Sequence, residues 1–305
     1  MATIRGKLLD QDTGEVVAVG FGGWPGYRTN RTDRRYRYEE DSGKAIMADV
    51  TLDIVDGAAF LTVGCEEKKN AMDSNLRSET IAPKILECRQ NDDVQVLVFQ
   101  TEGDVFSTGG DLQELLDNDY RAEAIKRIGE SWEELHFQLL NLGKPTVAKV
   151  DGLALAGAAN LLLYNDIVVA TEDAQIGWSG VGWGIVEWFS STRLQHYIGP
   201  RKAMYYLLTG ELIDAIDAEA MGLVTKTVPS EELDATVDNI VDSLTDKHPR
   251  TLKRMREAVY RSMEMSPSAA LEVTKRDVYD LNSSDPPLEE GIEAFLENRK
   301  PDWVK

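Results

Sequence analysis

Residues 106–116 have the sequence FSTGGDLQELL, in which two glycines separate an apolar stretch from a helical pattern. The preceding residues 94–99, VQVLVF, are typical of a buried strand, and a helix is expected to begin at Asp111. Backbone N–H groups at a helix entrance have no intrahelical partners, and the helix dipole adds positive potential there. The sequence therefore predicts a junction that can hold an anionic oxygen, although glycines before a helix also serve as plain turns.

A second junction of this kind lies at residues 151–160, DGLALAGAAN. It follows a predicted strand at 146–150 and leads into a predicted helix near 158–164. Two helix entrances that each follow a buried strand can direct their N–H groups at one carbonyl oxygen. The pair of junctions therefore predicts an oxyanion hole.

The alternation of strands, glycine-containing turns and helices predicts the α/β fold class. A hairpin is expected around Asp56-Gly57, between strands at 50–56 and 58–63. The further elements expected from periodicity are helices at 75–88 and 121–142, a strand at 167–170, and helices at 201–209, 215–222, 230–246, 249–265, 267–281 and 286–298.

Three regions differ in composition. Residues 1–48 are rich in Gly, Arg and Tyr and are expected to form an irregular N-terminal arm, which either packs on the acidic body or binds phosphate or a nucleotide. Residues 49–200 carry the α/β pattern and both junctions. Residues 201–305 are almost entirely helical, which suggests a cap or an assembly surface.

The charge and the cysteine content exclude several classes of function. The chain has 305 residues, with 33 Lys and Arg against 53 Asp and Glu, and a net charge of −20. This charge repels phosphate backbones and anionic membranes, so we expect no nucleic-acid binding and no membrane binding. The longest apolar stretch, 153–170, is interrupted by polar residues and does not predict a membrane span. Two cysteines and no apolar signal segment predict a cytoplasmic location, and no metal site is expected.

Several segments together resemble a known family. They are FSTGGDLQELL, GCEEKKNAM at 64–72, KPTVAKVDGLALAGAANLLLYNDIVVATEDAQIGW at 144–178, IGPRKAMYYLLTGELIDAIDAEAMGLVTKTVP at 198–229 and EGIEAFLENRKPDW at 290–303. From about Ala48 to Trp303 the chain resembles the crotonase, or enoyl-CoA hydratase/isomerase, superfamily. The resemblance implies a crotonase-like ββα spiral with a helical C-terminal trimerisation region, assembly as a homotrimer or a hexamer (dimer of trimers), and an acyl-CoA ligand. It implies no cofactor beyond the coenzyme A of the substrate.

The resemblance also assigns site residues. It places the two oxyanion donors at Gly110 and Gly157, and it makes Asp111 a residue that fixes the loop. Contacts with CoA are implied near Lys68 and Lys69, whose charge suits an anionic ligand unless they are only a solvated pair. The substrate-binding residues implied are Lys68, Lys69, Ala71, Thr108, Gly109, Asp111, Asn160, Gly180, Trp183 and Trp188.

The sequence departs from the family pattern where proton transfer is concerned. Hydratases of this family carry glutamates at the positions of Asn160 and Gly180. Neither asparagine nor glycine exchanges a proton, so the ordinary two-glutamate hydration mechanism is not expected.

Two further departures concern the CoA side. Cys65-Glu66 replaces the usual Arg-Pro, so contacts with the adenine are expected to differ. Asn298 replaces a lysine of the last helix that often reaches CoA from a neighbouring subunit, and Arg299 or Lys300 is the candidate substitute.

Glu187 is the remaining acidic residue near the site, within WSGVGWGIVEW at 178–188. Naphthoyl-CoA synthases of the superfamily place a catalytic aspartate after a similar glycine-rich run, and the Trp-Gly-Ile of 183–185 resembles that of hydroxycinnamoyl-CoA hydratase-lyases. Trp183, Trp188 and Phe189 are expected to desolvate the carboxyl group and raise its pKa, which suits a general acid or base. Glu187 is therefore the predicted catalytic residue, and the alternative is a surface or inter-subunit role.

The expected function is that of an acyl-CoA enzyme that stabilises a thioester enolate. Isomerase, hydratase-lyase or C–C bond-cleaving chemistry on a bulky or aromatic acyl-CoA is favoured. The alternatives are a ring-forming or ring-opening Claisen-type synthase or hydrolase, and a non-catalytic CoA-binding subunit. His136 and Tyr279 are secondary candidates for proton transfer, although a histidine on a helix face is more often structural.

Overall fold

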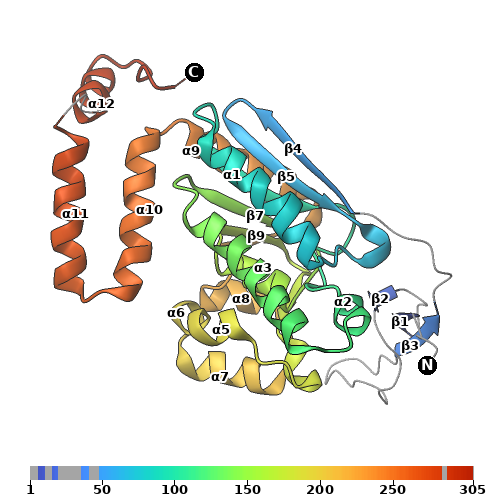
Figure 1. Ribbon diagram of the computed structural model, residues 1–305. Helices are drawn as coiled ribbons and strands as arrows, with labels where there is room; N and C mark the ends of the chain where they lie inside the picture. The colour runs from blue at the N-terminus through green and yellow to red at the C-terminus, as the bar shows by residue number, and fades with distance from the viewer. Residues whose placement is uncertain (1–5, 11–15, 20–35, 41–47, 284–286, 305) are drawn as a thin grey trace.

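The computed structural model describes residues 6–10, 16–19, 36–40, 48–283 and 287–304 (Figure 1). Its centre is a sheet of order β12-β9-β7-β6-β5-β4, in which neighbouring strands are parallel except in the β4–β5 hairpin. A second sheet has the order β11-β10-β8. The strands are β4 (Asp49–Val55), β5 (Ala58–Gly64), β6 (Val96–Thr101), β7 (Thr146–Val150), β8 (Leu153–Leu155), β9 (Ile167–Thr171), β10 (Gln175–Gly177), β11 (Ile213–Asp214) and β12 (Lys226–Val228).

Helices cover both faces of the main sheet, which explains its continuous apolar strands. In β6, Leu97 and Phe99 belong to the larger core, whereas Val96 and Val98 belong to a smaller core on the other face. Helices α1 (Ala82–Gln90) and α3 (Ala122–Leu140) cover the first face, and α9 (Leu233–Thr245) packs on β6, β7 and β9 from the second (Figure 1).

The expected elements are present within a few residues of their predicted ends, because their apolar periods are long enough to be recognised. A π-helical segment, Leu76–Ile81, precedes α1, and short 3-10 turns lie at Glu66–Lys68, Ser179–Trp183 and Ser230–Glu232. The remaining helices are α2 (Leu112–Asp117), α4 (Gly157–Leu162), α5 (Trp188–Arg193), α6 (Gln195–Ile198), α7 (Pro200–Thr209), α8 (Ala215–Met221), α10 (Pro249–Glu264), α11 (Pro267–Leu281) and α12 (Pro287–Leu296).

The main sheet extends past the predicted boundary at residue 200. Strand β12 pairs in parallel with β9, and helix α9 packs on β9. The sequence does not predict β8, β10, β11 or β12, because strands of two or three residues have no recognisable period. The helical part that stands apart from the body therefore begins at α10 rather than at residue 201.

The N-terminal arm is more regular than predicted. Its described parts are β1 (Gly6–Asp10), β2 (Val16–Val19) and β3 (Tyr36–Glu40), which form an antiparallel sheet of order β2-β1-β3. Valines and tyrosines in the second and third of these segments favour strands. The prediction of an irregular arm is therefore wrong for the described parts of residues 1–48. Most of the arginine-rich part of the arm, 28–35, lies outside the described residues.

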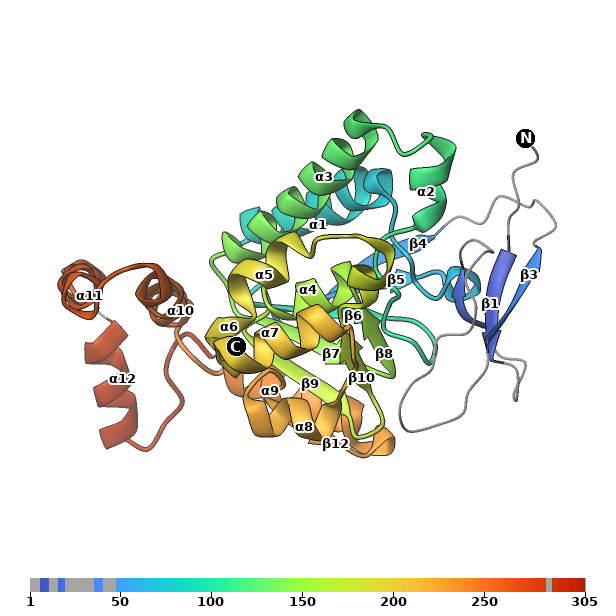
Figure 2. The ribbon, with the colours of Figure 1, turned by 90° about the horizontal axis from the view of Figure 1, so that it is seen from below.

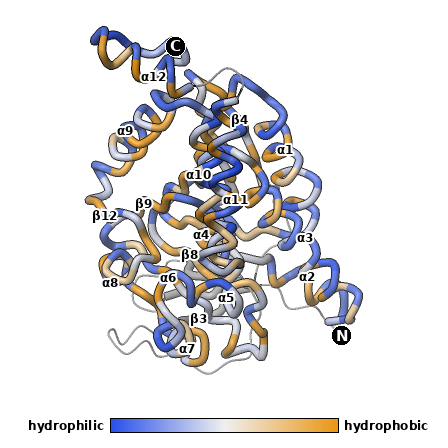
Figure 3. Tube along the Cα trace, turned by 90° about the vertical axis from the view of Figure 1, so that its left-hand side faces the viewer, coloured by the Kyte–Doolittle hydropathy of each residue, from blue (hydrophilic) through white to orange (hydrophobic). Residues whose placement is uncertain are grey.

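The C-terminal helices lie at the opposite end of the molecule from the β1–β3 sheet (Figure 2). Arg256 fastens α10 to the body by donating to the Asp166 carboxylate at 2.7 Å and to the backbone oxygens of Leu139 and Leu140 at 2.8 and 2.6 Å. Apolar residues appear along the outer helices in Figure 3. The large apolar side chains that α10, α11 and α12 expose are Met255, Val259, Leu271, Val278, Tyr279, Leu288, Ile292, Phe295 and Leu296.

Candidate active site

The first glycine junction is held in place by the segment that precedes α1. The Met72 N–H group donates to Gly109 O at 2.8 Å, and the Asp111 N–H group donates to Met72 O at 3.1 Å. The Gly109 N–H group donates to Ser107 Oγ at 3.0 Å. The Gly110 N–H group lies between these engaged groups and has no acceptor among the described residues. Gly110 is therefore the residue whose donor this junction leaves available.

The second junction is the turn from β8 into α4. Ala156 has φ 48° and ψ −115°, a strained conformation for a residue with a side chain, and Gly157 follows as the first helical residue. The Gly157 N–H group also has no acceptor within the described chain. A side chain at Gly109, which has φ +90°, would lie 3.0 Å from Gly157 N and 2.7 Å from Leu155 O. The two junctions are thus in contact, and a glycine is required at 109 for this approach.

Helix α3 connects the junctions to the loop that carries Glu187. A Cβ atom at Gly157 would lie 2.2 Å from Cζ2 of Trp132, and one at Gly110 would lie 3.8 Å from its Nε1. One turn earlier on the same face of α3, a Cβ atom at Gly129 would lie 2.0 Å from Cζ3 of Trp188. Trp132 is therefore against both junctions, and the residue after Glu187 is packed one helical turn away.

Glu187 lies at the N-terminus of α5 with its carboxylate turned inward. The residue is 8% exposed, and its Oε1 atom has no hydrogen-bond partner among the described residues. Burial raises the pKa of Glu187 to about 7, although the neighbouring backbone N–H group of Gly180 acts in the opposite direction. A Cβ atom at Gly180 would lie 2.4 Å from Glu187 Oε1. The carboxylate therefore occupies the space that a side chain at residue 180 would need.

The aromatic residues near Glu187 are less buried than the sequence predicts. Trp183 and Trp188 are 51% and 48% exposed, because the loop 181–188 lies at the surface of the body. Phe189 packs instead on the ring of His136, with 4.4 Å between the ring centroids. The half-exposed indoles leave flat apolar surface on the loop that carries Glu187.

Asn160 has a structural partner. Its Oδ1 atom accepts a hydrogen bond of 2.8 Å from the Trp178 indole nitrogen, and both residues are buried. This bond fixes the amide oxygen, because breaking it would leave the Trp178 donor without a partner in the core. Of the two positions at which the resemblance expects glutamates, one therefore carries a fixed amide and the other has no side chain.

Comparison with known proteins identifies the family. The sequence model of enoyl-CoA hydratase/isomerase matches residues 54–305, which is most of the chain. The chain belongs to the enoyl-CoA hydratase/isomerase family. The resemblance found in the sequence is thereby confirmed, and acyl-CoA enzymes are the class to which this protein belongs.

Relatives and solved structures of this family cover most of the chain. Enoyl-CoA hydratase domain-containing protein 3, mitochondrial, of Mus musculus is 29% identical over 81% of this chain and 82% of its own length. Hydroxycinnamoyl-CoA hydratase-lyase of Pseudomonas fluorescens is 28% identical over 82% of this chain and 92% of its own length. The crystal structure of an enoyl-CoA hydratase from Mycobacterium smegmatis has a TM-score of 0.79 at 26% identity, covering 84% of this chain and 99% of that one. The predicted crotonase fold is confirmed by these likenesses.

The lysines that the family resemblance places at the CoA site each have an acidic partner. Lys68 Nζ is 2.8 Å from Asp111 Oδ2, and Lys69 Nζ is 3.4 Å from Asp104 Oδ1. Asp111 also caps α2 by accepting from the Gln113 N–H group at 2.9 Å. Asp111 therefore caps α2 and pairs with Lys68, and the ion pair reduces the positive charge that Lys68 presents to a ligand.

The remaining family positions behave differently from one another. Ala71 is buried beside this loop, and Thr108 donates its backbone N–H to Lys69 O at 3.1 Å. Arg299 is paired with Glu290 at 2.6 Å and with Glu297 at 2.7 Å. One of the two candidate substitutes for the missing CoA-binding lysine is therefore already engaged within the C-terminal segment, and the other, Lys300, lies 4.0 Å from Asp246 Oδ1.

The two secondary candidates for proton transfer lie in different surroundings, His136 in an aromatic stack that includes Trp132 and Tyr279 on an outer helix. His136 is fully buried and stacked on Tyr164, with 4.4 Å between centroids, and burial lowers its pKa to about 3. A histidine that stays neutral in an apolar stack acts as a packing residue. Tyr279 is 70% exposed on the outer helix α11.

Sequence reasoning does not identify the buried residues that pack near the junctions, Arg77, Ser131 and Trp132. Arg77 interrupts a helical pattern, which is the one signal that could have singled it out. The described residues contain neither a candidate membrane-spanning helix nor a candidate metal site. No described helix is long and apolar enough to cross a membrane. Within the same residues, no group of three or more His, Cys, Asp or Glu side chains could hold a metal ion.

Proposed function

We propose that this protein forms an enolate from the thioester of a bulky or aromatic acyl-CoA. The N–H groups of Gly110 and Gly157 hold the thioester oxygen, and Glu187 moves the proton at the neighbouring carbon. Each oxyanion donor lowers the barrier by about 3 kcal/mol in enzymes of known mechanism. The observation that carries the proposal is the buried Glu187 carboxylate in the space of the missing residue-180 side chain.

The environment of Glu187 suits proton transfer near neutral pH. A carboxyl group with a pKa of about 7 is present in both protonation states at that pH, so it can accept a proton and return it. Its Oε1 atom is buried and has no hydrogen-bond partner within the described chain, so the proposal requires that the bound acyl group reach this atom. Ordinary hydration by two glutamates is disfavoured, because Asn160 is fixed by Trp178 and Gly180 has no side chain.

The exposed indoles support a flat acyl group. Trp183 and Trp188 offer half-exposed aromatic faces on the same loop as the proposed acid–base residue. The relative from Pseudomonas fluorescens is named for a hydroxycinnamoyl-CoA substrate. We therefore propose isomerase, hydratase-lyase or C–C bond-cleaving chemistry on an aromatic or similarly bulky acyl-CoA, with no cofactor beyond the CoA of the substrate.

Two alternatives make different predictions for Glu187. A Claisen-type synthase or hydrolase would use the same enolate and the same Glu187 carboxylate. It would differ from the proposed chemistry only in the molecule that reacts with the enolate. A non-catalytic CoA-binding subunit would bind the thioester and never enolise it. We further propose a cytoplasmic homotrimer or hexamer, whose contacts use the exposed apolar side chains of α10–α12.

Enolate formation can be tested before the natural substrate is known. We expect the wild-type protein to exchange the α-protons of 3-phenylpropionyl-CoA for deuterium in D₂O, measured by proton NMR. Glu187→Gln should slow the exchange about 10²- to 10⁴-fold, because the amide cannot exchange a proton. Glu172→Gln, at an exposed glutamate after β9, is the matched control and should exchange at the wild-type rate.

Three outcomes of this experiment have different meanings. Exchange that survives Glu187→Gln within tenfold would remove Glu187 from the mechanism. Tight binding of the thioester by calorimetry without exchange would favour the non-catalytic subunit. Exchange with saturated thioesters, followed by a screen of aromatic enoyl and 3-hydroxyacyl thioesters, would separate isomerase from lyase chemistry.

A further inference from the structure

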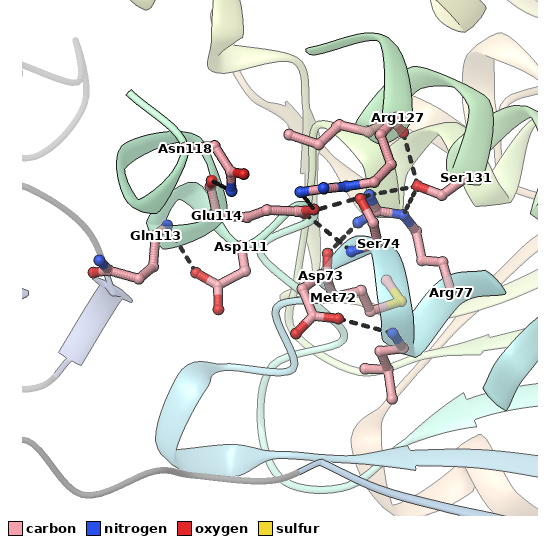
Figure 4. Close-up of polar contacts among 12 residues, drawn as sticks. Met72, Asp73, Ser74, Arg77, Asp111, Gln113, Glu114, Asn118, Arg127 and Ser131 are labelled. Carbon is pink, nitrogen blue, oxygen red and sulfur yellow. Dashed lines mark hydrogen bonds and ion pairs between the residues drawn. The ribbon is translucent and has the colours of Figure 1, made fainter. Parts of the chain in front are cut away.

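A fully buried arginine, Arg77, lies between the segment before α1 and helix α3 (Figure 4). Arg77 donates from Nη1 to the backbone oxygen of Met72. It donates from Nε and Nη2 to Ser131 Oγ at 3.0 and 2.8 Å, and from Nη2 to Ser74 Oγ at 3.2 Å. The guanidinium therefore joins the segment before α1 to helix α3.

The acceptor of the Nη1 bond is the residue that frames the first junction. Met72 O accepts from both Arg77 and the Asp111 N–H group, while Met72 N–H donates to Gly109 O. The peptide groups on both sides of Gly110 are thus tied to Met72. Because Arg77 holds the Met72 carbonyl, it indirectly sets the direction of the free Gly110 N–H group.

The same guanidinium also reaches the second junction through one aromatic ring. Arg77 Cζ lies 4.3 Å from the centroid of the Trp132 ring. The same indole also lies against Gly157, whose Cβ position would be 2.2 Å from Trp132 Cζ2. Ser131 precedes Trp132 in α3, so the serine that anchors the guanidinium is covalently joined to the indole.

The charge of Arg77 is retained in this buried position. Burial lowers the pKa of Arg77 to about 10, so the group remains protonated at neutral pH. Glu114 Oε2 lies 3.9 Å from Nη2, and Glu114 is itself held by the Ser74 N–H group at 3.0 Å and by Arg127 at 3.2 Å. The nearby carboxylate offsets the cost of burying a cation.

We infer that Arg77 and Trp132 are positioning residues that fix the two oxyanion donors relative to each other. The guanidinium suits this task because its donors form a rigid plane, which can hold a carbonyl and a hydroxyl while stacking on an indole. An error of about 1 Å in such geometry costs about 10²-fold in rate. The inference rests on the proposed function, because it assigns a role to the oxyanion hole of that proposal.

The test uses a spectroscopic readout of the oxyanion hole. Cinnamoyl-CoA absorbs in the near ultraviolet, and polarisation of its thioester carbonyl by two donors shifts the band to longer wavelength. We expect the bound band to be shifted in the wild-type protein. Arg77→Lys should lose most of this shift and slow deuterium exchange of 3-phenylpropionyl-CoA about 10²-fold, with little change in KM.

Arg256 provides the matched control. It is also a buried arginine, and it also donates to backbone carbonyls and a carboxylate, but it lies between α10 and the body. Arg256→Lys should lower the melting temperature while leaving the spectral shift and the exchange rate at wild-type values. A purely structural role for Arg77 would give the same pattern in Arg77→Lys and would overturn the inference.

Two further variants cover the case in which Arg77→Lys does not fold. Trp132→Phe keeps the arginine and removes the indole atoms that lie against Gly157, and Ser131→Ala removes the hydroxyl that anchors Nε and Nη2. Each should reduce the spectral shift and the exchange rate together, and folded variants that keep both would overturn the inference. An unshifted band with wild-type protein would instead overturn the oxyanion hole itself, and the role of Arg77 with it.

Discussion

The body around the glycine junctions and the C-terminal helices α10–α12 differ in how far their apolar side chains are buried within one chain. In the body, large side chains such as Phe99 and Phe106 are fully buried, and even Arg77 has partners for its guanidinium. On α12, Phe295 and Leu296 are 82% and 75% exposed. The body can therefore hold its site geometry within one chain, whereas the outer helices present apolar surface that another molecule is expected to cover.

The largest effect is expected from a methyl group added inside the body. Gly157→Ala places a Cβ atom 2.2 Å from Trp132 Cζ2, so the indole or the start of α4 must move. We expect kcat to fall about 10²-fold and stability to fall by about 1–3 kcal/mol. Deuterium exchange and chemical denaturation measure the two effects.

Gly110→Ala is the matched control for this change. It adds the same methyl group at the other donor, where the nearest atom is at an ordinary 3.8 Å, and it keeps the backbone N–H. Its stability should stay close to that of the wild type. Equal losses in the two variants would mean that Trp132 does not restrict the second junction.

The next effect concerns the pH dependence of stability. The folded protein holds the Glu187 proton up to a pKa of about 7, whereas the unfolded chain releases it near 4.5. The folded state therefore binds more protons in this window, and stability falls as pH rises from about 4.5 to 7. Relative to Glu187→Gln, in which residue 187 does not titrate, the loss should approach roughly 3 kcal/mol.

Urea denaturation of both proteins at pH 5 and pH 8 measures this difference. The exchange rate should also show an inflection near pH 7 in the wild type that the variant lacks. A difference in stability that is the same at both pH values would show that Glu187 is not buried as a titrating group.

A change in the outer helices is expected to alter the assembly of the protein and to leave the fold of the body nearly unchanged. Phe295→Asp puts a charge on the apolar face of α12, so we expect a lower mass by light scattering and a nearly unchanged circular dichroism spectrum. Glu293→Gln, at an exposed polar position of the same helix, should keep the wild-type mass. If Phe295→Asp also keeps the wild-type mass, α12 is not part of the assembly.

The smallest effect is expected at the CoA lysines. Among the described residues, the one ion-pair partner of Lys69 is the exposed Asp104 at 3.4 Å, so the positive charge of Lys69 is only weakly offset. Lys69→Ala should weaken CoA binding about threefold, measured by calorimetry, because exposed charge pairs contribute about 0.2–1 kcal/mol. Lys126→Ala, at an exposed lysine of α3 paired with Glu130, should leave the affinity unchanged. The opposite result would place the CoA phosphates elsewhere.

The sequence alone determined the fold class, most element positions and the family. These follow from local features: apolar periods, the glycines of the two junctions, and motifs that lie close together in the chain. Asn160 and Gly180 were also sufficient to argue against two-glutamate hydration, because that argument needs only the identity of the residues.

The tertiary structure alone decided which side chains meet. Glu187 is brought against Gly180 by a loop that folds back on itself, Lys68 is paired with Asp111 across 43 positions, and Arg77 meets Ser131 across 54. No period or motif encodes such pairs, because each depends on how separate helices and loops pack into one core. The sequence thus determined what kind of site this protein has, and packing decided which groups hold it in place.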